Sequence, residues 1–443
     1  MTQQDVAPGA VVRFGVAAWS LWDFGAIGLN AIVATFVFNV YLTSTVGAGL
    51  QGGTTPASWL GRTAAIAGVV IAVLAPAVGV WVESPHRRRV ALAVLTGMAV
   101  VLTSCMYLIR AQPSYLWAGL ALLAATAACS DLASVPYNAM LRQLSTPQTA
   151  GRISGIGSAA GYLGSVMLLA VLYVGFISGK GEERGLLHLS THDGLNVRTA
   201  MLATAAWLAV LGLPLLFIAH RLPHSGEVSR PTSIRGGYRK LWTEVKAEWQ
   251  RDRNLVYFLA ASALFRDALA GLFAFGTVVG VNVFGVSQAN VLIFGVAASV
   301  LAAVGAVLGG IVDHRIGSKP VIVGSLVVIL AMVFALLVVS GQPAFWAAGL
   351  LLCVFIGPAQ SSARALLLHM ANQGKEGVAF GLYTMTGRAV AFLAPWLFSV
   401  FVDTFGSVRA GLIGIALVLT AGILAMLVVR VPPRRGVVAL EQV

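Results

Sequence analysis

Long apolar runs recur along the whole chain, and they limit its possible folds more than any other feature. About twelve runs are each roughly 20 residues long, enough to cross about 30 Å of hydrocarbon as a helix. Rich in Leu, Ala, Val and Gly without strict alternation, they favour membrane helices over a barrel. The sequence predicts an all-α membrane protein with twelve transmembrane helices, approximately Phe14–Leu42, Leu60–Val82, Val90–Ile109, Tyr115–Leu141, Ile153–Ile177, Val197–Ala219, Leu255–Phe284, Val291–Val312, Pro320–Val339, Ala344–Met370, Val378–Val402 and Ala410–Val431.

The charge content excludes a soluble globule. Charged residues make up only 10% of the chain, against about 25% in soluble proteins. A net charge of +13 would suggest nucleic acid in a soluble domain, but here most basic residues lie in short loops between apolar runs. Cys105, Cys129 and Cys353 all fall inside apolar runs, without metal-ligand spacing. We therefore expect no nucleic-acid partner, no metal and no cofactor.

The loop charges predict the orientation in the membrane. Basic residues concentrate in the second, fourth, sixth, eighth and tenth connections, including Arg87–Arg89 and Lys375, whereas the fifth connection is mixed in charge. By the positive-inside rule these loops and both termini are cytoplasmic, in a plasma or inner membrane. The fifth connection then lies outside, and its His188 and His192 fit solvated loop residues better than a metal pair.

A basic linker, residues 220–254, divides the chain into an N-terminal six-helix bundle, residues 1–219, and a C-terminal one, residues 255–443. Apolar residues recur in the linker at helical spacing, with basic residues between them. This pattern predicts an amphipathic helix on the anionic inner leaflet. The apolar positions are Ile234, Tyr238, Leu241, Trp242, Val245 and Trp249.

The two halves repeat each other. Four residues of the fourth and fifth spans have counterparts 226 residues later in the tenth and eleventh spans: Asn138 and Arg364, Gly151 and Gly377, Gly155 and Gly381, and Gly161 and Gly387. A constant offset over two helices indicates two pseudo-symmetric six-helix bundles of parallel orientation.

A loop motif in each half resembles that of the major facilitator superfamily: a glycine, an acidic residue four positions later and a basic turn. Gly79 and Glu83 carry it in the first half, and Gly309 and Asp313 in the second. Within this superfamily the chain resembles the vacuole-effluxer-like branch, the autophagy-related amino-acid effluxers and their bacterial relatives. The supporting segments are Trp22-Asp23-Phe24, Pro136-Tyr137-Asn138-Ala139, Gly151 to Gly164, Gln360 to Arg364, Phe380 to Tyr383 and Gly387-Arg388.

The resemblance covers essentially all twelve spans and implies two bundles that rock around a central solute site. It also implies gating roles for Gly79, Glu83, Arg87, Gly309 and Asp313. Arg142, at the membrane edge of the fourth span, fits a loop latch better than a solute ligand, and we group it with the gate.

Three acidic residues inside spans are candidates for proton coupling. Asp23 lies near the bilayer midplane, where a lone carboxylate is costly, so it either carries a proton or forms a structural ion pair. Asp131 lies deep in the fourth span and can do the same. Asp267 follows Arg266 in the seventh span, and this adjacent pair serves either transport or internal pairing, because neighbouring helical side chains point about 100° apart.

Two buried arginines are candidates for solute binding. Arg388 can clasp a carboxylate or phosphate in two-point fashion, and Arg364 either contacts solute or closes a gate. Gln360, Tyr383 and Asn138 are further candidates, with packing as the alternative role for Tyr383 and for Tyr162.

We therefore predict a monomeric secondary active transporter for a small amino-acid-like, anionic or zwitterionic solute, moved by proton-coupled efflux among membrane lipids. The alternative is an exporter of lipid, drug or siderophore-like amphiphiles. A membrane enzyme is disfavoured, because His369 is the one histidine clearly inside a predicted span and the sequence suggests no catalytic partner for it. The glycine-rich segments lack the Gly-Lys-Ser/Thr ending of a nucleotide-binding loop.

Overall fold

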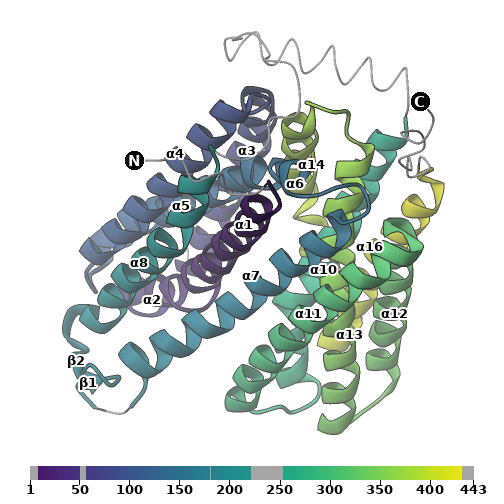
Figure 1. Cartoon of the computed structure of the whole chain (residues 1–443). Coiled ribbons are helices and arrows are strands. Elements are labelled where there is room, and N and C mark those ends of the chain that lie inside the picture. The colour runs from purple at the N-terminus through teal and green to yellow at the C-terminus, as the bar shows by residue number, and fades with distance from the viewer. Residues whose placement is uncertain (1–7, 50–55, 180, 221–252, 432–443) are drawn as a thin grey trace, which may run out of the picture.

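The computed structural model describes residues 8–49, 56–179, 181–220 and 253–431. Within these residues, 12 helices are long and apolar enough to cross a membrane. They pack side by side along one common direction (Figure 1). The predicted all-α, twelve-span membrane fold is confirmed. The predicted amphipathic helix of the linker lies outside the described residues.

The first six spans form the N-terminal half. The first span is interrupted: α1 passes through a π-helical stretch, Ala31–Phe36, into the short α2. The helices of this half are α1 (Pro8–Asn30), α2 (Phe38–Ser44), α3 (Pro56–Trp81), α4 (Pro85–Cys105), α5 (Leu116–Ala139), α6 (Leu141–Leu144), α7 (Ala150–Leu172) and α8 (Leu195–Ile218). A two-stranded antiparallel hairpin, β1 (Glu183–Arg184) and β2 (Leu189–Ser190), lies between α7 and α8 and pairs Glu183 with Ser190.

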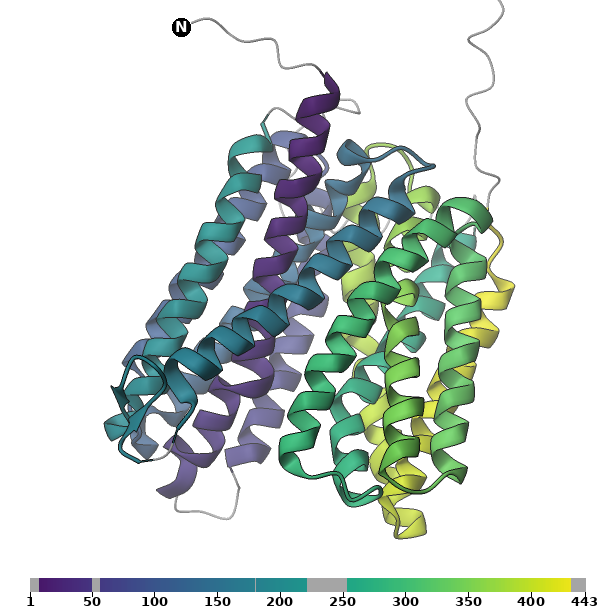
Figure 2. The same ribbon diagram turned by 60° about the horizontal axis from the view of Figure 1, so that its bottom comes forward.

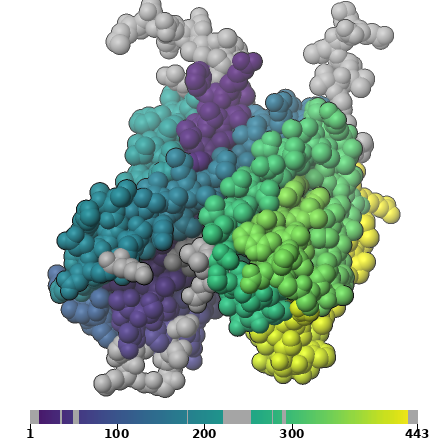
Figure 3. Space-filling model, turned by 90° about the horizontal axis from the view of Figure 1, so that it is seen from below, coloured from purple at the N-terminus to yellow at the C-terminus, as the bar shows by residue number. Residues whose placement is uncertain are grey.

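The last six spans form the C-terminal half, coloured green to yellow in Figure 1. Its helices are α10 (Asn254–Asn282), α11 (Gln288–Ile316), α12 (Ser318–Val338), α13 (Gln342–Met370), α14 (Glu376–Val390), α15 (Leu393–Phe405) and α16 (Gly411–Val428). Viewed from another side, the two halves stand next to each other as two lobes (Figure 3).

The two ends of the bundle differ in charge. We call one end of the bundle the basic side. At this end the chain connects α3 to α4, α5 through α6 to α7, α11 to α12, and α13 to α14. The connections on this side carry Arg87–Arg89, His314 with Arg315, and Lys375. The opposite side carries the β1–β2 hairpin, and the two sides are separated along the helix axes in Figure 2.

The predicted eleventh span, Val378–Val402, is not one continuous helix. It is broken into α14 and α15, and a turn at Ala391 and Phe392 separates them. Pro395 is the physical cause, because proline lacks the backbone N–H that would bond the carbonyl four residues earlier, and its ring clashes with that carbonyl. The carbonyl four residues before Pro395 belongs to Ala391, which lies in the turn.

The 226-residue offset reappears in space. Adding 226 to the bounds of α5 and to the start of α7 places them on α13 and on the start of α14. Two residue pairs with this offset also touch each other, since Arg364 contacts Asn138 and Arg142 donates to the carbonyl of Leu368. Equivalent residues meet each other only near a two-fold axis, so α5 and α13 lie beside the pseudo-symmetry axis.

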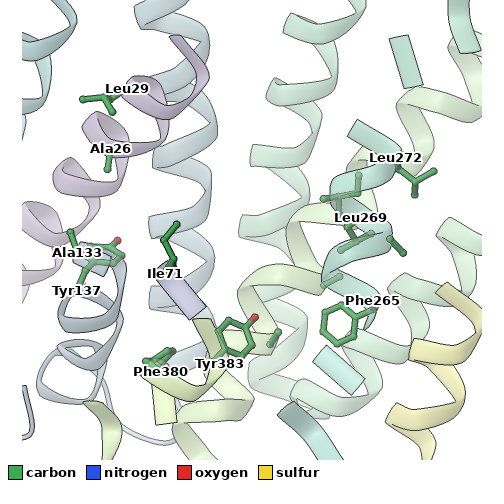
Figure 4. Packing of buried hydrophobic residues seen from close by; sticks show 14 of the residues in the cluster. Ala26, Leu29, Ile71, Ala133, Tyr137, Phe265, Leu269, Leu272, Phe380 and Tyr383 are labelled. Carbon is green, nitrogen blue, oxygen red and sulfur yellow. The ribbon is translucent and has the colours of Figure 1, made fainter. Parts of the chain in front are cut away.

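The buried apolar core is continuous across both halves. Figure 4 shows Tyr137 and Ala133 of α5 on one side, Phe380 and Tyr383 of α14 near the centre, and Phe265 of α10 on the other. Because their surroundings are apolar, the few charged residues at the junction of the halves cost free energy unless they are paired.

Candidate functional site

Ion pairs connect the two halves at three depths. Starting from the basic side, α5 and α6 carry Arg142, then Asn138, then Asp131. Asn138 and Asp131 are seven residues apart, which is about 10 Å along a helix. Each of the three residues contacts a charged residue of the C-terminal half: Glu376, Arg364 and Arg388, respectively. The line of polar side chains along α5 therefore faces the other half.

Glu376 is the centre of the basic-side level. It is the first residue of α14 and is 1% exposed. Its carboxylate lies 3.4 Å from Nη2 of Arg88 and 2.6 Å from Nε of Arg142, and it also accepts the backbone N–H of Gly374. Two arginines of the N-terminal half therefore share one carboxylate of the C-terminal half.

The same arginines cap helix ends at the basic side. Arg142 Nη2 donates to the carbonyls of Leu368 (2.6 Å) and Ala371 (2.8 Å), at the end of α13. Arg88 Nη1 donates to the carbonyl of Ala139, the last residue of α5. Helix ends leave carbonyls without intrahelical partners, and cations stabilise them. The Glu376 ion pairs and the Arg142 caps join the two halves on this side, while the Arg88 cap lies within the N-terminal half.

A second basic-side pair and a close helix contact reinforce the closure. Lys375 Nζ lies 3.4 Å from the buried carboxylate of Glu83. Gly79 of α3 packs directly on the backbone of Gly377 in α14, where a Cβ on Gly79 would come within 2.4 Å of the Gly377 carbonyl. Only glycine allows this approach at residue 79.

The second loop motif also brings a glycine to the junction of the halves. Gly310, not Gly309, lies against the other half, where a Cβ would approach the Gly151 carbonyl to 2.7 Å. Gly309 faces Pro358 of its own half, because successive helical residues point about 100° apart. Asp313 is buried beside Gly151, so this predicted gate residue does lie at the junction.

Arg364 occupies the middle level. Its Nη1 lies 3.4 Å from both the Asp23 carboxylate and Oδ1 of Asn138. Its Nη2 donates to the carbonyl of Ser154 (3.1 Å) and to the hydroxyl of Ser158. The side chains of Arg364 and Asp23 are only 14% and 7% exposed. A C-terminal-half arginine is thus inserted among residues of the N-terminal half.

Three stacked aromatic rings of α1 and α5 lie beside Arg364. Tyr137 stacks between Trp19 (centroids 4.5 Å apart) and Trp22 (4.3 Å apart). Trp19 Nε1 donates to the Tyr137 carbonyl, and Gly157 leaves room for the Trp19 ring. The Arg364 guanidinium lies 5.7 Å from the Trp19 ring centroid, within cation–π range. These rings fix α1 against α5 and hold the Asp23 carboxylate in place.

Arg388 and Asp131 form the third level, furthest from the basic side. Arg388 Nη2 pairs with Oδ2 of Asp131. Their side chains are 39% and 22% exposed, more than those of the middle level. Both lie well inside the predicted spans, and they join opposite halves. The junction is therefore more exposed at this depth than at the Arg88–Glu376 pair on the basic side.

Asp267 does not join these levels. Its Oδ2 accepts the backbone N–H of Ala394 at 2.6 Å, in the first turn of α15. Its neighbour Arg266 donates to the Tyr383 carbonyl (3.0 Å) and stacks over the Tyr383 ring at 3.8 Å. The two residues thus bind the segments on either side of the break in span eleven. Both residues of this pair therefore make these contacts within the C-terminal half.

The remaining predicted site residues differ in burial and in their contacts. Tyr383 is buried under Arg266, and Tyr162 packs on alanines of α7 and α11. Gln360 is half-buried one helical turn before Arg364. The predicted gate residue Arg87 is half-buried, and its neighbour Arg88 makes the buried ion pair instead.

Sequence reasoning missed Arg88, Glu376 and Ser158. Arg88 is one of three consecutive arginines, Arg87–Arg89, which were used only to predict the orientation in the membrane. Glu376 lies in the connection between the predicted tenth and eleventh spans, so it was not among the charged residues considered inside spans. A usable signal was present, because Glu376 is the acidic first residue of a helix whose preceding loop meets the basic turn of the other half.

Histidines and cysteines do not form a metal site among the described residues. His369 lies 2.6 Å from the Pro147 carbonyl of the other half, and His314 lies 2.7 Å from the Gln148 carbonyl. Both contacts add to the basic-side closure. His188 pairs with Glu183 on the exposed hairpin.

Comparison with known proteins identifies the family. The family described as vacuole effluxer Atg22 like matches residues 53–438. An uncharacterized MFS-type transporter of Bacillus subtilis (strain 168), YxiO, is 21% identical over 411 residues, covering 92% of this chain and 93% of YxiO.

Solved structures agree in fold. The proton:xylose symporter XylE superposes with a TM-score of 0.72 at 12% identity, covering 95% of each chain. FucP in its outward conformation gives 0.66 at 12% identity, covering 94% of this chain and 97% of FucP. A bacterial homologue of ferroportin in its outward-facing state also gives 0.66, at 13% identity over 94% of this chain and 98% of that one. The chain therefore belongs to the vacuole effluxer Atg22-like family of major facilitator transporters, and it is a multi-pass membrane transporter, not an enzyme.

Proposed function

We propose that this transporter moves a small zwitterionic solute, of the amino-acid type, by proton-coupled alternating access. The observation that carries the proposal is the pairing of opposite charges from the two halves at mid-span, Asp23 with Arg364 and Asp131 with Arg388. Membrane proteins retain such residues at a cost of several kcal/mol, and they mark solute and ion pathways.

Arg388 and Asp131 are the proposed solute-binding pair. They are the more exposed of the two mid-span pairs, and each comes from a different half. A guanidinium binds a carboxylate in two-point fashion, and a carboxylate binds an ammonium group. A solute carrying both groups would replace the Arg388–Asp131 contact and bridge the halves. The family description as effluxers supports export as the direction.

Asp23 is the proposed proton carrier. In the described state its charge is compensated by Arg364 of the other half. If the halves separate on the basic side, Arg364 leaves with α13, and a lone buried carboxylate is costly unless it takes up a proton. Loss of the ion pair and protonation of Asp23 would then occur together, which couples proton movement to rocking.

The basic side is the proposed cytoplasmic side, in a plasma or inner membrane, with both termini inside. With that orientation, the sealed Glu376 level and the exposed Arg388–Asp131 pair correspond to an outward-facing state. Opening to the cytoplasm requires breaking the contacts of Glu376 with Arg88 and Arg142. The protein is proposed to act as a monomer.

Flux into liposomes tests the solute assignment. Counterflow of radiolabelled leucine is compared with leucine amide, which lacks the carboxylate, and with 4-methylpentanoate, which lacks the amine. We expect counterflow of leucine alone. Arg388→Ala and Asp131→Asn should each raise KM about 10- to 100-fold, because a hydrogen bond to a charged group contributes about 1.5–3 kcal/mol. Flux of a lipid-like or siderophore-like amphiphile without amino-acid flux would favour the alternative exporter.

The same liposomes test the coupling residue. Asp23→Asn should keep counterflow and lose accumulation driven by a pH gradient. Asp267→Asn retains a side-chain oxygen that can accept the Ala394 N–H, so it should keep both. Coupling would be misassigned if Asp267→Asn abolished gradient-driven accumulation while Asp23→Asn retained it.

A further inference from the structure

The groups that accept hydrogen bonds from the Arg364 guanidinium, and its ion-pair partner, come from the N-terminal half. They are the Asp23 carboxylate of α1, Oδ1 of Asn138 on α5, and the Ser154 carbonyl and Ser158 hydroxyl of α7. The ring of Trp19 forms one wall, 5.7 Å from the guanidinium carbon. We call this set of groups the Arg364 socket.

The chemistry of the socket is that of an organic-cation site. It offers one carboxylate, three neutral oxygen acceptors and one aromatic face, the groups that bind guanidinium and ammonium ions. The Asn138 amide is oriented for this role, because its Nδ2 donates to the Ser134 carbonyl at 2.8 Å and its Oδ1 faces Arg364. The stacked rings of Trp19, Tyr137 and Trp22 join α1 to α5 within the N-terminal half and so keep Asp23 and Asn138 on neighbouring helices.

The occupant of the socket belongs to the other half. Arg364 is carried by α13, and the basic-side contacts of Glu376, Arg142 and Lys375 hold α13 and α14 against the N-terminal half. When these contacts break, the guanidinium is withdrawn and the acceptors remain together, because they belong to one half. This step rests on the rocking motion proposed above.

We propose that the Arg364 socket is a second binding site, for a small organic cation of the guanidinium or primary ammonium class. The cation enters when Arg364 withdraws and competes with Arg364 for the same acceptors. A cation bound there stabilises the state in which the halves are parted on the basic side, so the socket gives cationic solutes or the ammonium end of a zwitterion a way to promote opening.

Titration of an emptied socket with methylguanidinium tests this proposal without any transport step. In purified Arg364→Ala protein, about 10 mM methylguanidinium should raise the melting temperature by about 2–4 °C, since a ligand that binds only the folded state stabilises it by mass action. Wild-type protein, whose socket is filled by Arg364, should show no rise. Urea at the same concentration controls for general denaturant effects.

The matched control is Arg364→Ala combined with Asp23→Asn, which removes the carboxylate of the socket and should abolish the rise. If Arg364→Ala does not accumulate in the membrane, Arg364→Gln, whose amide keeps part of the volume, is titrated in the same way. No rise in either single variant, or an equal rise in the variant lacking Asp23, would overturn the proposal. Failure of leucine counterflow in wild-type liposomes would leave this result unchanged, so the two proposals fail separately.

Discussion

Replacing Arg364 by alanine should lower the free energy of unfolding by about 3–5 kcal/mol, one of the two largest stability effects expected from a single side chain at the junction. The cause is the Asp23 carboxylate, 7% exposed, which loses its cationic partner and cannot move to water. The Asn138, Ser154 and Ser158 acceptors also lose their donor. Transport should be abolished in the same variant, and reversible denaturant unfolding in detergent measures the stability change.

A double-mutant cycle separates pairing from packing. Asp23→Asn in the Arg364→Ala background removes the uncompensated charge and should recover about half of the lost stability, while Asp23→Asn alone leaves the arginine unpaired and should cost about as much as Arg364→Ala. Additive losses of the two substitutions would mean that Asp23 and Arg364 do not stabilise each other, contrary to the contact described here.

Replacing Glu376 by glutamine should open the basic side. The substitution leaves Arg88, which is buried, without its carboxylate, and it removes the charge that holds Arg142. Breaking a buried pair costs several kcal/mol, and each 1.4 kcal/mol changes an equilibrium tenfold. The junction should therefore spend at least about ten times longer in the state opened on this side.

A cysteine at residue 154 reports this opening. Ser154 is fully buried and its hydroxyl donates to the Ser361 carbonyl of the other half. In a background lacking the three native cysteines, a water-soluble thiol reagent should label Ser154→Cys slowly, and at least about tenfold faster with Glu376→Gln. Glu83→Gln is the matched control. Its partner Lys375 is 38% exposed and can be hydrated when the pair is lost, unlike the buried Arg88, so labelling should change by less than about threefold. Equal labelling in Glu376→Gln and wild type would exclude Glu376 as the latch.

The fold was largely predictable because its signals are local. Apolar length identified the spans, and the repeat of Asn138 and Arg364 identified the two halves. The break in span eleven was missed even though Pro395 marks it, since membrane helices also tolerate proline without breaking, as α13 does at Pro358.

The sequence predicted the members of the site only as charged residues inside membrane spans, where a charge costs free energy. Asp23, Asp131, Arg364 and Arg388 are each conspicuous in an apolar span, but their pairing depends on how two halves meet, which no spacing within one helix encodes. Arg87 and Arg88 point about 100° apart on α4, and only Arg88 faces Glu376 of the other half. In the same way Gly310 faces the other half, whereas its neighbour Gly309 faces Pro358 of its own half. Asp267 was grouped with Asp23 as a candidate for proton coupling, yet it caps α15, because a broken helix leaves N–H groups without partners.

We propose that the junction of the two halves is the part of the transporter that moves. The most direct test is a pair of spin-label distances, one across the basic side between His86→Cys and Arg315→Cys, the other across the opposite side between Ser114→Cys and Ser340→Cys; all four positions are exposed. When Glu376→Gln is introduced into the labelled proteins, the basic-side distance should lengthen and the opposite-side distance should shorten, because two rigid halves rock about their junction. Unchanged distances on both sides, or lengthening on both, would contradict it.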